Sequence, residues 1–341
     1  MKALVAVLAA ATAATATAAA TATAAHAKVL HVGPGQHYHR PCQAIAAARP
    51  GDQIDLDARG NPYRGDVCAW STNHLTIVGV HGRAHVEAAG QSSQGKAIWV
   101  IAGDDTTIEN VEFSGARVPD QNGAGVRQEG ANLMIEHCYF HDNQEGILAG
   151  DNPASSIVID SSVFARNGAG DGFSHNIYIN HVRSFTLRHS YSTDANVGHL
   201  VKSRALRNYI LYDRLTGEQG TDSYELDLPN GGLSYVIGTV LEQGTHTQNP
   251  NMLAYGEEGE LNPDSHLYAV NDTFVNGLGR GAAMLIGDGV APVLAENDLS
   301  TGSAVFVGQA GALLRHNCVT ADPRFVNPAR YDYTLRASSP C

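Results

Sequence analysis

Basic residues are scarce in this chain of 341 residues, which has 22 lysines and arginines against 34 aspartates and glutamates. A formal net charge of −12 is unfavourable for a nucleic-acid partner, because nucleic-acid phosphates attract basic surfaces. The sequence also lacks a phosphate-binding loop, paired zinc cysteines and a dinucleotide-binding glycine motif. After residue 27 it has no apolar run long enough to span a bilayer. We therefore expect no nucleic-acid partner and no membrane span.

The first 27 residues have the pattern of an export signal. Lys2 precedes an apolar, alanine-rich stretch that ends at the small-residue site Ala25-His26-Ala27. Threonines dilute this stretch after Ala11, which disfavours a transmembrane anchor. We predict a signal peptide over residues 1–27, a single domain over residues 28–341 and a secreted or periplasmic monomer.

A short unit repeats from about residue 105 onward. Each unit has a strand with alternating apolar residues, a turn rich in Asn, Asp or Gly, and a second short strand. Such units without helices are typical of a solenoid whose strands stack into parallel sheets. We predict an all-β, right-handed parallel β-helix with about 25 residues per coil. The equivalent positions, expected in one interior ladder, are Ile135, Ile159, Leu187, Leu211 and Ile237.

The ends of such a rod need covering, because they expose strand edges. We predict an N-terminal cap over about residues 28–70, with an amphipathic helix at residues 43–50, and a closing segment at residues 322–341.

An oxidising compartment favours disulfides. We predict the pairs Cys42–Cys68 and Cys318–Cys341, each worth about 3 kcal/mol by loop closure. Cys138 is left over, and we expect it to be buried and reduced.

A basic segment is followed by an acidic one. Residues 175–214 contain six basic and two acidic residues, whereas residues 215–262 contain eight acidic residues and no lysine or arginine. Because residues one coil apart become neighbours, we expect Tyr178, Lys202 and either Glu225 or Asp227 to form a ladder. The residues expected to flank it are His175, Asn176, His199 and Arg204. Such a cluster is either a salt-bridged outer face or a site for an anionic sugar, and we favour the site.

The repeat, with the segments "KSRA", "LPNGG" and "YGEEG", resembles the pectate-lyase-like superfamily of right-handed β-helix proteins. Locally, "HLVKSRALRNYILYDRLTGEQG" resembles the segment that carries the base of chondroitinase B and related alginate lyases. This resemblance places Lys202 and Ser203 on their lysine-serine pair and Asn208 on their asparagine. It implies cleavage of a polysaccharide by β-elimination. The arginine of those lyases, about one coil later, has no counterpart here, where "SYELDLPNGG" stands.

Elimination from a uronic acid needs a neutralised carboxylate, a base for the C5 proton and an acid for the departing oxygen. We expect Arg204 to pair with the carboxylate and Lys202 to be the base, its pKa lowered by neighbouring cations and burial. Tyr178, His175 and His199 are the candidates for the acid. Further substrate contacts are expected from Asn176, Arg183, Tyr224, Asn230 and Tyr255.

The acidic residues allow other interpretations. Glu225 and Asp227 could hold a calcium ion, which prefers oxygen ligands. They could instead be the working pair of a glycoside hydrolase, roughly 6.5–7 Å apart on one strand. The segment "YGEEGE", with Glu257, Glu258 and Glu260, could add a carboxylate from the next coil, but we favour a solvated acidic turn. A third class is a non-catalytic glycan-binding or adhesion β-helix, with a platform of the outward tyrosines Tyr178, Tyr209, Tyr224 and Tyr255. We favour an exported lyase acting on a uronate-containing acidic polysaccharide.

Overall fold

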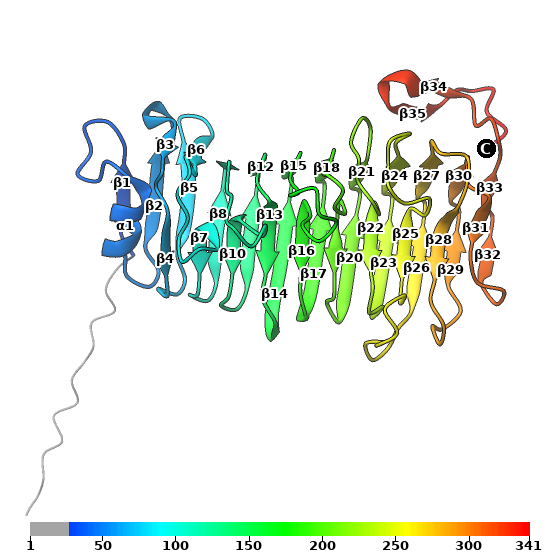
Figure 1. Ribbon diagram of the computed structural model, residues 1–341, viewed down its shortest axis with the longest axis horizontal. Coiled ribbons are helices and arrows are strands. Elements are labelled where there is room, and N and C mark those ends of the chain that lie inside the picture. The colour runs from blue at the N-terminus through cyan, green and yellow to red at the C-terminus, as the bar shows by residue number, and fades with distance from the viewer. Residues whose placement is uncertain (1–26) are drawn as a thin grey trace, which may run out of the picture.

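The computed structural model describes residues 27–341, which wind into one elongated parallel β-helix (Figure 1). The export signal predicted over residues 1–27 therefore lies outside the described residues, apart from Ala27. Three long parallel sheets of 12, 10 and 11 strands form the faces of the rod in the described part of the chain. None of the helices in residues 27–341 is long and apolar enough to cross a membrane.

The strands of each sheet follow one another along the rod axis. The first sheet consists of β1 (Val29–Val32), β2 (Gln53–Asp57), β5 (Thr76–Val80), β8 (Thr106–Glu109), β11 (Leu133–Glu136), β14 (Asn152–Asp160), β17 (Val182–Arg188), β20 (Arg207–Leu211), β23 (Leu233–Ile237), β26 (Leu267–Val270), β29 (Leu294–Glu296) and β32 (Leu313–Arg315). The second sheet consists of β4 (Cys68–Trp70), β7 (Ala97–Ile101), β10 (Ala124–Gln128), β13 (Glu145–Ala149), β16 (Ile177–Ile179), β19 (Lys202–Ser203), β22 (Leu226–Leu228), β25 (Leu253–Tyr255), β28 (Ala282–Ile286) and β31 (Val305–Val307). The third sheet consists of β3 (Tyr63–Arg64), β6 (Ala84–Glu87), β9 (Val111–Ser114), β12 (Tyr139–His141), β15 (Val163–Ala165), β18 (Tyr191–Thr193), β21 (Arg214–Thr216), β24 (Val240–Gln243), β27 (Thr273–Asn276), β30 (Leu299–Thr301) and β33 (Cys318–Val319).

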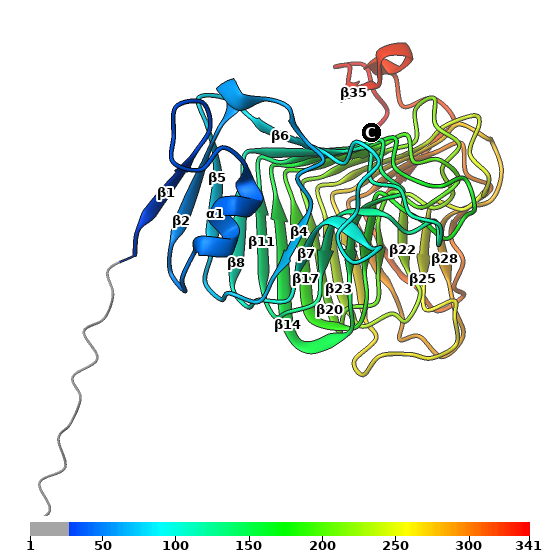
Figure 2. The same ribbon diagram turned by 60° about the vertical axis from the view of Figure 1, so that its left-hand side comes forward.

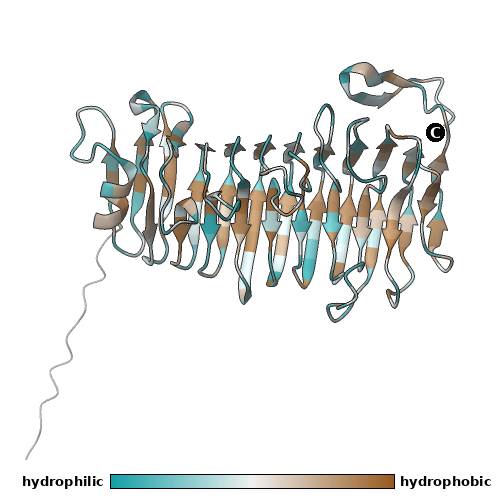
Figure 3. Cartoon of the chain, in the orientation of Figure 1, coloured by the Kyte–Doolittle hydropathy of each residue, from teal (hydrophilic) through white to brown (hydrophobic). Residues whose placement is uncertain are grey.

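Apolar side chains alternate with polar ones along most strands, so that one set fills the interior (Figure 3). Ile135, Ile159 and Leu187 are neighbours in register and fully buried, as predicted. The rings of Phe113, Phe140 and Phe164 stack in the same interior, with centroids 4.9 and 4.8 Å apart.

The predicted ladder is wrong at its last two members. Leu187 aligns with Ile210 and then with Val236, whereas Leu211 and Ile237 are only partly buried on the outer side. The step after Leu187 is one residue shorter than the strand pattern suggests. Because successive side chains point to opposite faces, a shift of one residue exchanges the inward and outward sets.

A helix covers the first coil of the rod, whereas apolar side chains of the last coil stay exposed. The short helix α1 (Pro41–Ala47) packs against β1, β2 and β4 at the first coil (Figure 2), two residues before the predicted start because Pro41 begins it. A 3-10 turn, η1 (Ala58–Gly60), follows β2. Near the other end β34 (Phe325–Asn327), the 3-10 turn η2 (Pro328–Arg330) and β35 (Asp332–Leu335) form a hairpin that lies along the third sheet. The predicted closing segment therefore does not cover the last coil, where Leu313, Leu314 and Val319 are 50%, 54% and 60% exposed.

The predicted cysteine chemistry is confirmed. Disulfides join Cys42 to Cys68 and Cys318 to Cys341, so one cross-link fastens each end of the chain. Cys138 is free and buried.

Candidate active site

The outer face of the second sheet carries the predicted ladder. Tyr178 on β16 aligns with Lys202 on β19, which aligns with Asp227 on β22. Lys202 Nζ lies 3.1 Å from Asp227 Oδ2. The third member of the ladder is therefore Asp227 and not Glu225.

Two cations on this face hold one carboxylate from a neighbouring loop. Glu258, in the loop after β25, places Oε1 3.1 Å from Lys202 Nζ and Oε2 2.6 Å from Arg204 Nη1. The side chains of Lys202 and Arg204 are 12% and 15% exposed, whereas that of Glu258 is 45% exposed. The expectation of a solvated acidic turn is therefore wrong for Glu258.

Arg204 is held in place by two further contacts. Its Nη1 donates to Asn230 Oδ1 at 2.6 Å, and its Nε donates to Tyr178 Oη at 3.1 Å. The Tyr178 oxygen is thus an acceptor for Arg204 and keeps its own proton for another partner. Arg204, Tyr178 and Lys202 consequently form one connected surface.

The charge of Lys202 is stabilised rather than suppressed. Burial opposes the charged form, but Asp227 and Glu258 outweigh it, and the pKa of Lys202 is raised. This result is contrary to the lowered pKa expected from the sequence. Burial raises the pKa of Asp227 to about 6, although Lys202 acts in the opposite direction.

Two buried histidines, His175 and His199, lie beside the ladder of Tyr178, Lys202 and Asp227. The backbone N–H of His199 donates to His175 Nδ1 at 2.9 Å, and that of Tyr224 donates to His199 Nδ1 at 3.3 Å. Each neutral ring therefore carries its proton on Nε2. His199 Nε2 lies 3.4 Å from Asp227 Oδ2.

Both histidines are held in the neutral form. Burial lowers the pKa of His199 to about 3 and that of His175 well below its ordinary value. Their rings stack with centroids 4.4 Å apart. His175 is 2% exposed, so it can support the site but cannot contact a substrate.

The local sequence explains how this corner of the coil is built. A side chain in place of Gly198 would collide with the carbonyl oxygen of Ser174, so glycine permits the close approach of neighbouring coils before His199. Ser203 Oγ donates to Asn208 Oδ1 at 2.6 Å and accepts from the N–H of Ala205. The buried serine and asparagine thus fix the turn that presents Lys202 and Arg204.

Three expected substrate contacts lie elsewhere. Asn176 is fully buried and donates to Ser192 Oγ, and Tyr255 is fully buried. Arg183 is exposed on β17 of the first sheet and donates to Ser156 Oγ. Tyr255 lies on the three-residue strand β25, which gives too little alternation to assign inward and outward positions from sequence.

The other two expected contacts belong to the site. Asn230 orients Arg204, and the Tyr224 ring lies 5.2 Å from that of His199.

Glu225 and Asp227 face different surroundings. Glu225 is fully buried beside Asp222, and no donor outside this pair reaches the carboxyl oxygens of either residue in the described part of the chain. Burial raises the pKa of Glu225 well above its ordinary value and that of Asp222 to about 7. Since Asp227 pairs with Lys202, the two residues do not fit a shared calcium ion. Nor can the buried Glu225 flank a glycosidic bond with Asp227.

A family model and one solved structure agree with this architecture. The family model described as right handed beta helix region matches residues 67–214. The crystal structure of pectate lyase Pel9A aligns with a TM-score of 0.54 at 13% identity, covering 86% of this chain and 77% of that chain. A pectin methylesterase from Aspergillus niger gives a TM-score of 0.38 at 10% identity, covering 86% of each chain. No curated protein sequence matches the chain. The chain therefore has the right-handed parallel β-helix fold.

Proposed function

We propose that this protein is an exported enzyme that cleaves a uronate-containing acidic polysaccharide by β-elimination at Lys202 and Arg204. The observation that carries the proposal is that both cations bind the Glu258 carboxylate. Lys202 Nζ lies 3.1 Å and Arg204 Nη1 2.6 Å from its oxygens. A uronic acid carries the same chemical group on its sugar ring. A substrate carboxylate can therefore replace Glu258 between the two cations.

The raised pKa of Lys202 favours a different division of roles from that expected from the sequence. Lys202 and Arg204 together neutralise the substrate carboxylate, which stabilises the negative charge that develops when C5 loses its proton. Asp227, with a pKa of about 6, is ionised at neutral pH and serves as the base.

Tyr178 supplies the second proton transfer. Its oxygen already accepts from Arg204, so its phenolic proton is available to the departing glycosidic oxygen. The C5–H bond breaks and its proton passes to Asp227, the C4–O bond breaks, and a C4–C5 double bond forms. The Tyr178 phenolate is stabilised by the adjacent Arg204 guanidinium until it is reprotonated.

Two further observations support parts of the proposal. Disulfides at both ends of the chain favour an oxidising compartment and hence export. Pectate lyase Pel9A, which shares the fold, is named for action on pectate, and pectate is therefore one of the substrates to test.

The test is a screen of uronate-containing and neutral polysaccharides with the purified chain. Ultraviolet absorbance of the unsaturated product and the release of reducing ends are measured in parallel. Elimination raises both signals, whereas hydrolysis raises only reducing ends and contradicts the reaction proposed. Binding to a glycan without either signal would favour the non-catalytic alternative.

A further inference from the structure

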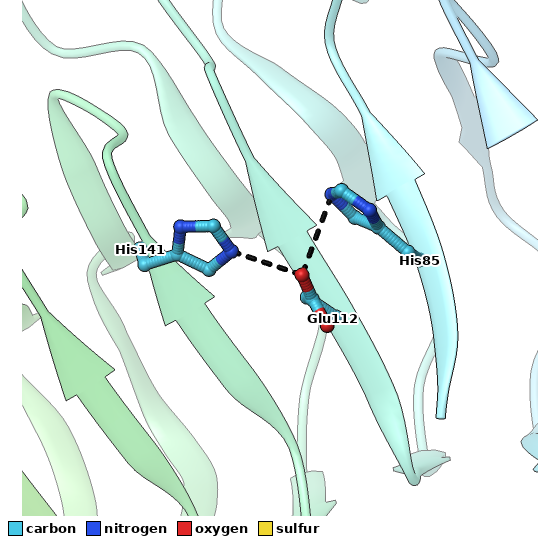
Figure 4. Close-up of side chains that lie close together, drawn as sticks. All are labelled: His85, Glu112 and His141. Atoms are coloured by element: carbon cyan, nitrogen blue, oxygen red, sulfur yellow. Dashed lines mark hydrogen bonds and ion pairs between the residues drawn. The ribbon is translucent and has the colours of Figure 1, made fainter. Parts of the chain in front are cut away.

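A second group of titratable side chains lies on the outer face of the third sheet, apart from the Lys202 face on the second sheet. His85 on β6, Glu112 on β9 and His141 on β12 come from three consecutive coils (Figure 4). His85 and Glu112 are partners in register, and Glu112 aligns with Tyr139, two residues before His141. The solenoid therefore brings together residues that are far apart in the sequence.

The three side chains converge at distances that suit a metal ion. His141 Nε2 lies 3.0 Å and His85 Nε2 3.6 Å from Glu112 Oε1, and the three ligand atoms all lie within 4.8 Å of one another. Tetrahedral ligands at about 2.0–2.1 Å from zinc are about 3.3 Å apart. The two distances to Glu112 lie on either side of that value.

The contact of His141 with Asp142 directs a nitrogen lone pair toward the centre of the group. His141 Nδ1 lies 2.6 Å from Asp142 Oδ2, so a neutral ring places its proton there and turns the Nε2 lone pair toward Glu112. His85 Nε2 lies 2.8 Å from Ser114 Oγ and 3.6 Å from Glu112 Oε1. A cation among these atoms would be held by the Glu112 carboxylate and by the Nε2 atoms of both histidines.

A carboxylate behind His141 orients its ring, as is common for histidines that bind metal ions. Asp142, which fixes the His141 tautomer, is itself held by Arg166 Nη2 at 2.9 Å. The Tyr139 ring stacks on that of His141 with centroids 4.3 Å apart. A carboxylate behind a ligating histidine is the usual second layer of a zinc site.

We propose that His85, Glu112 and His141 bind one divalent transition-metal ion of the zinc class. Two imidazoles and one carboxylate are a donor set that zinc accepts, with a fourth position left for water or another ligand. The side chains are 22%, 24% and 15% exposed, so the open position can face solvent. The proposal does not depend on the polysaccharide-cleaving function.

The test uses the purified chain, stripped of metal by a chelator and titrated with Zn²⁺ by isothermal calorimetry. We expect one tight site per chain, and we expect Zn²⁺ to raise the melting temperature by mass action. Co²⁺ in the same site should give the visible absorption of a tetrahedral complex. Absence of a stoichiometric site would show that His141 and Glu112 form only an ion pair, and would overturn the proposal.

Variants identify the ligands. His85→Ala, His141→Ala and Glu112→Gln should each weaken Zn²⁺ binding by at least about 100-fold, and Asp142→Asn by about 10- to 100-fold. The control is His181→Ala, which removes a histidine 3.0 Å from Asp151 in a similar pair elsewhere on the rod. Circular dichroism establishes that each variant is folded, and Glu112→Gln keeps the shape of the side chain. Unchanged binding in both histidine variants, or equal loss in His181→Ala, contradicts the proposed site.

Discussion

The ammonium group of Lys202 lies between two carboxylates, those of Asp227 and Glu258, each 3.1 Å away. This arrangement keeps the proton on the lysine, which is then suited to bind an anion rather than to remove a proton. Arg204, which stays charged, completes the anion site. In the proposed mechanism, both cations therefore bind the carboxylate of the substrate.

We expect Lys202→Ala to lower kcat by about 10²–10³, because the developing charge loses one of its two cations. Lys202→Arg should recover part of this loss, since it keeps the positive charge. A lysine that acted as the base could not be replaced by arginine, which does not give up its proton. Steady-state kinetics measures both variants, with Arg207→Ala, an exposed residue of the same segment, as the control. Full activity in Lys202→Ala would show that the lysine is structural.

We expect kcat/KM to increase as the pH rises through about 6, because Asp227 must lose its proton to act as the base. Asp227→Asn should lower kcat by about 10²–10⁴ and remove this part of the pH profile. The measurement is a pH series of initial rates for the wild type and the variant. An Asp227→Asn enzyme that keeps the same rise near pH 6 would assign the titration to another group.

At the scale of elements, the loop between β25 and β26 places a carboxylate on the proposed substrate site. Glu258 is 45% exposed and makes its ion pairs from a segment outside the three sheets. The loop therefore competes with any anionic substrate for the same two cations. Its partners Lys202 and Arg204, in contrast, lie on or directly after β19.

We expect Glu258→Gln to lower KM by roughly tenfold while kcat changes little, because the substrate no longer displaces a charged competitor. The matched control is Glu257→Gln, which changes an exposed neighbour repelled by Asp288. Steady-state kinetics on the same polysaccharide separates KM from kcat. A higher KM in Glu258→Gln would mean that Glu258 helps to hold the substrate or the two cations.

The sequence repeat predicts those features of the structure that depend on the number of residues per coil. The parallel β-helix and the alignment of Tyr178 with Lys202 follow from strand alternation and spacing, which left Glu225 and Asp227 as alternatives for the next position. The two disulfides follow from the positions of the cysteines near the two ends of the chain. The period does not control the loops, and for this reason the contact of Glu258 with Lys202, 56 residues away, was not predicted.

Local register also limits what the sequence can predict. The inward direction of Tyr255 depends on the register of a three-residue strand, where one residue decides the face. His85 and Glu112 could have been found by their spacing of one coil, but His85 precedes the clear part of the repeat.

At the scale of the whole molecule, many acidic groups are buried at the turns between sheets. Asp213 accepts from the N–H of Ser190, and Asp298 accepts from the N–H of Asp272, so carboxyl groups join neighbouring coils. Burial raises the pKa of Asp213 to about 8 and that of Asp222, Glu242 and Asp298 to about 7. The folded rod consequently carries less negative charge near neutrality than its formal −12.

The raised pKa values predict that the free energy of unfolding decreases as the pH rises from about 6.5 to 8. In this window the native state keeps protons on Asp213, Asp222, Glu242 and Asp298, whereas the same groups in the unfolded chain have already lost them. The native state thus binds more protons, and stability decreases by about 1.4 kcal/mol per pH unit for each proton retained.

The buried histidines oppose this trend only at lower pH. His175 and His199 remain neutral in the folded protein, whereas unfolded histidine gains a proton below about 6.5. Thermal unfolding followed by circular dichroism should therefore give a higher melting temperature at pH 6.5 than at pH 8. Asp222→Asn, which removes one titrating group while preserving its shape, should reduce the difference. A melting temperature that is constant or increases over this range would show that the buried carboxyl groups are ionised in the folded state.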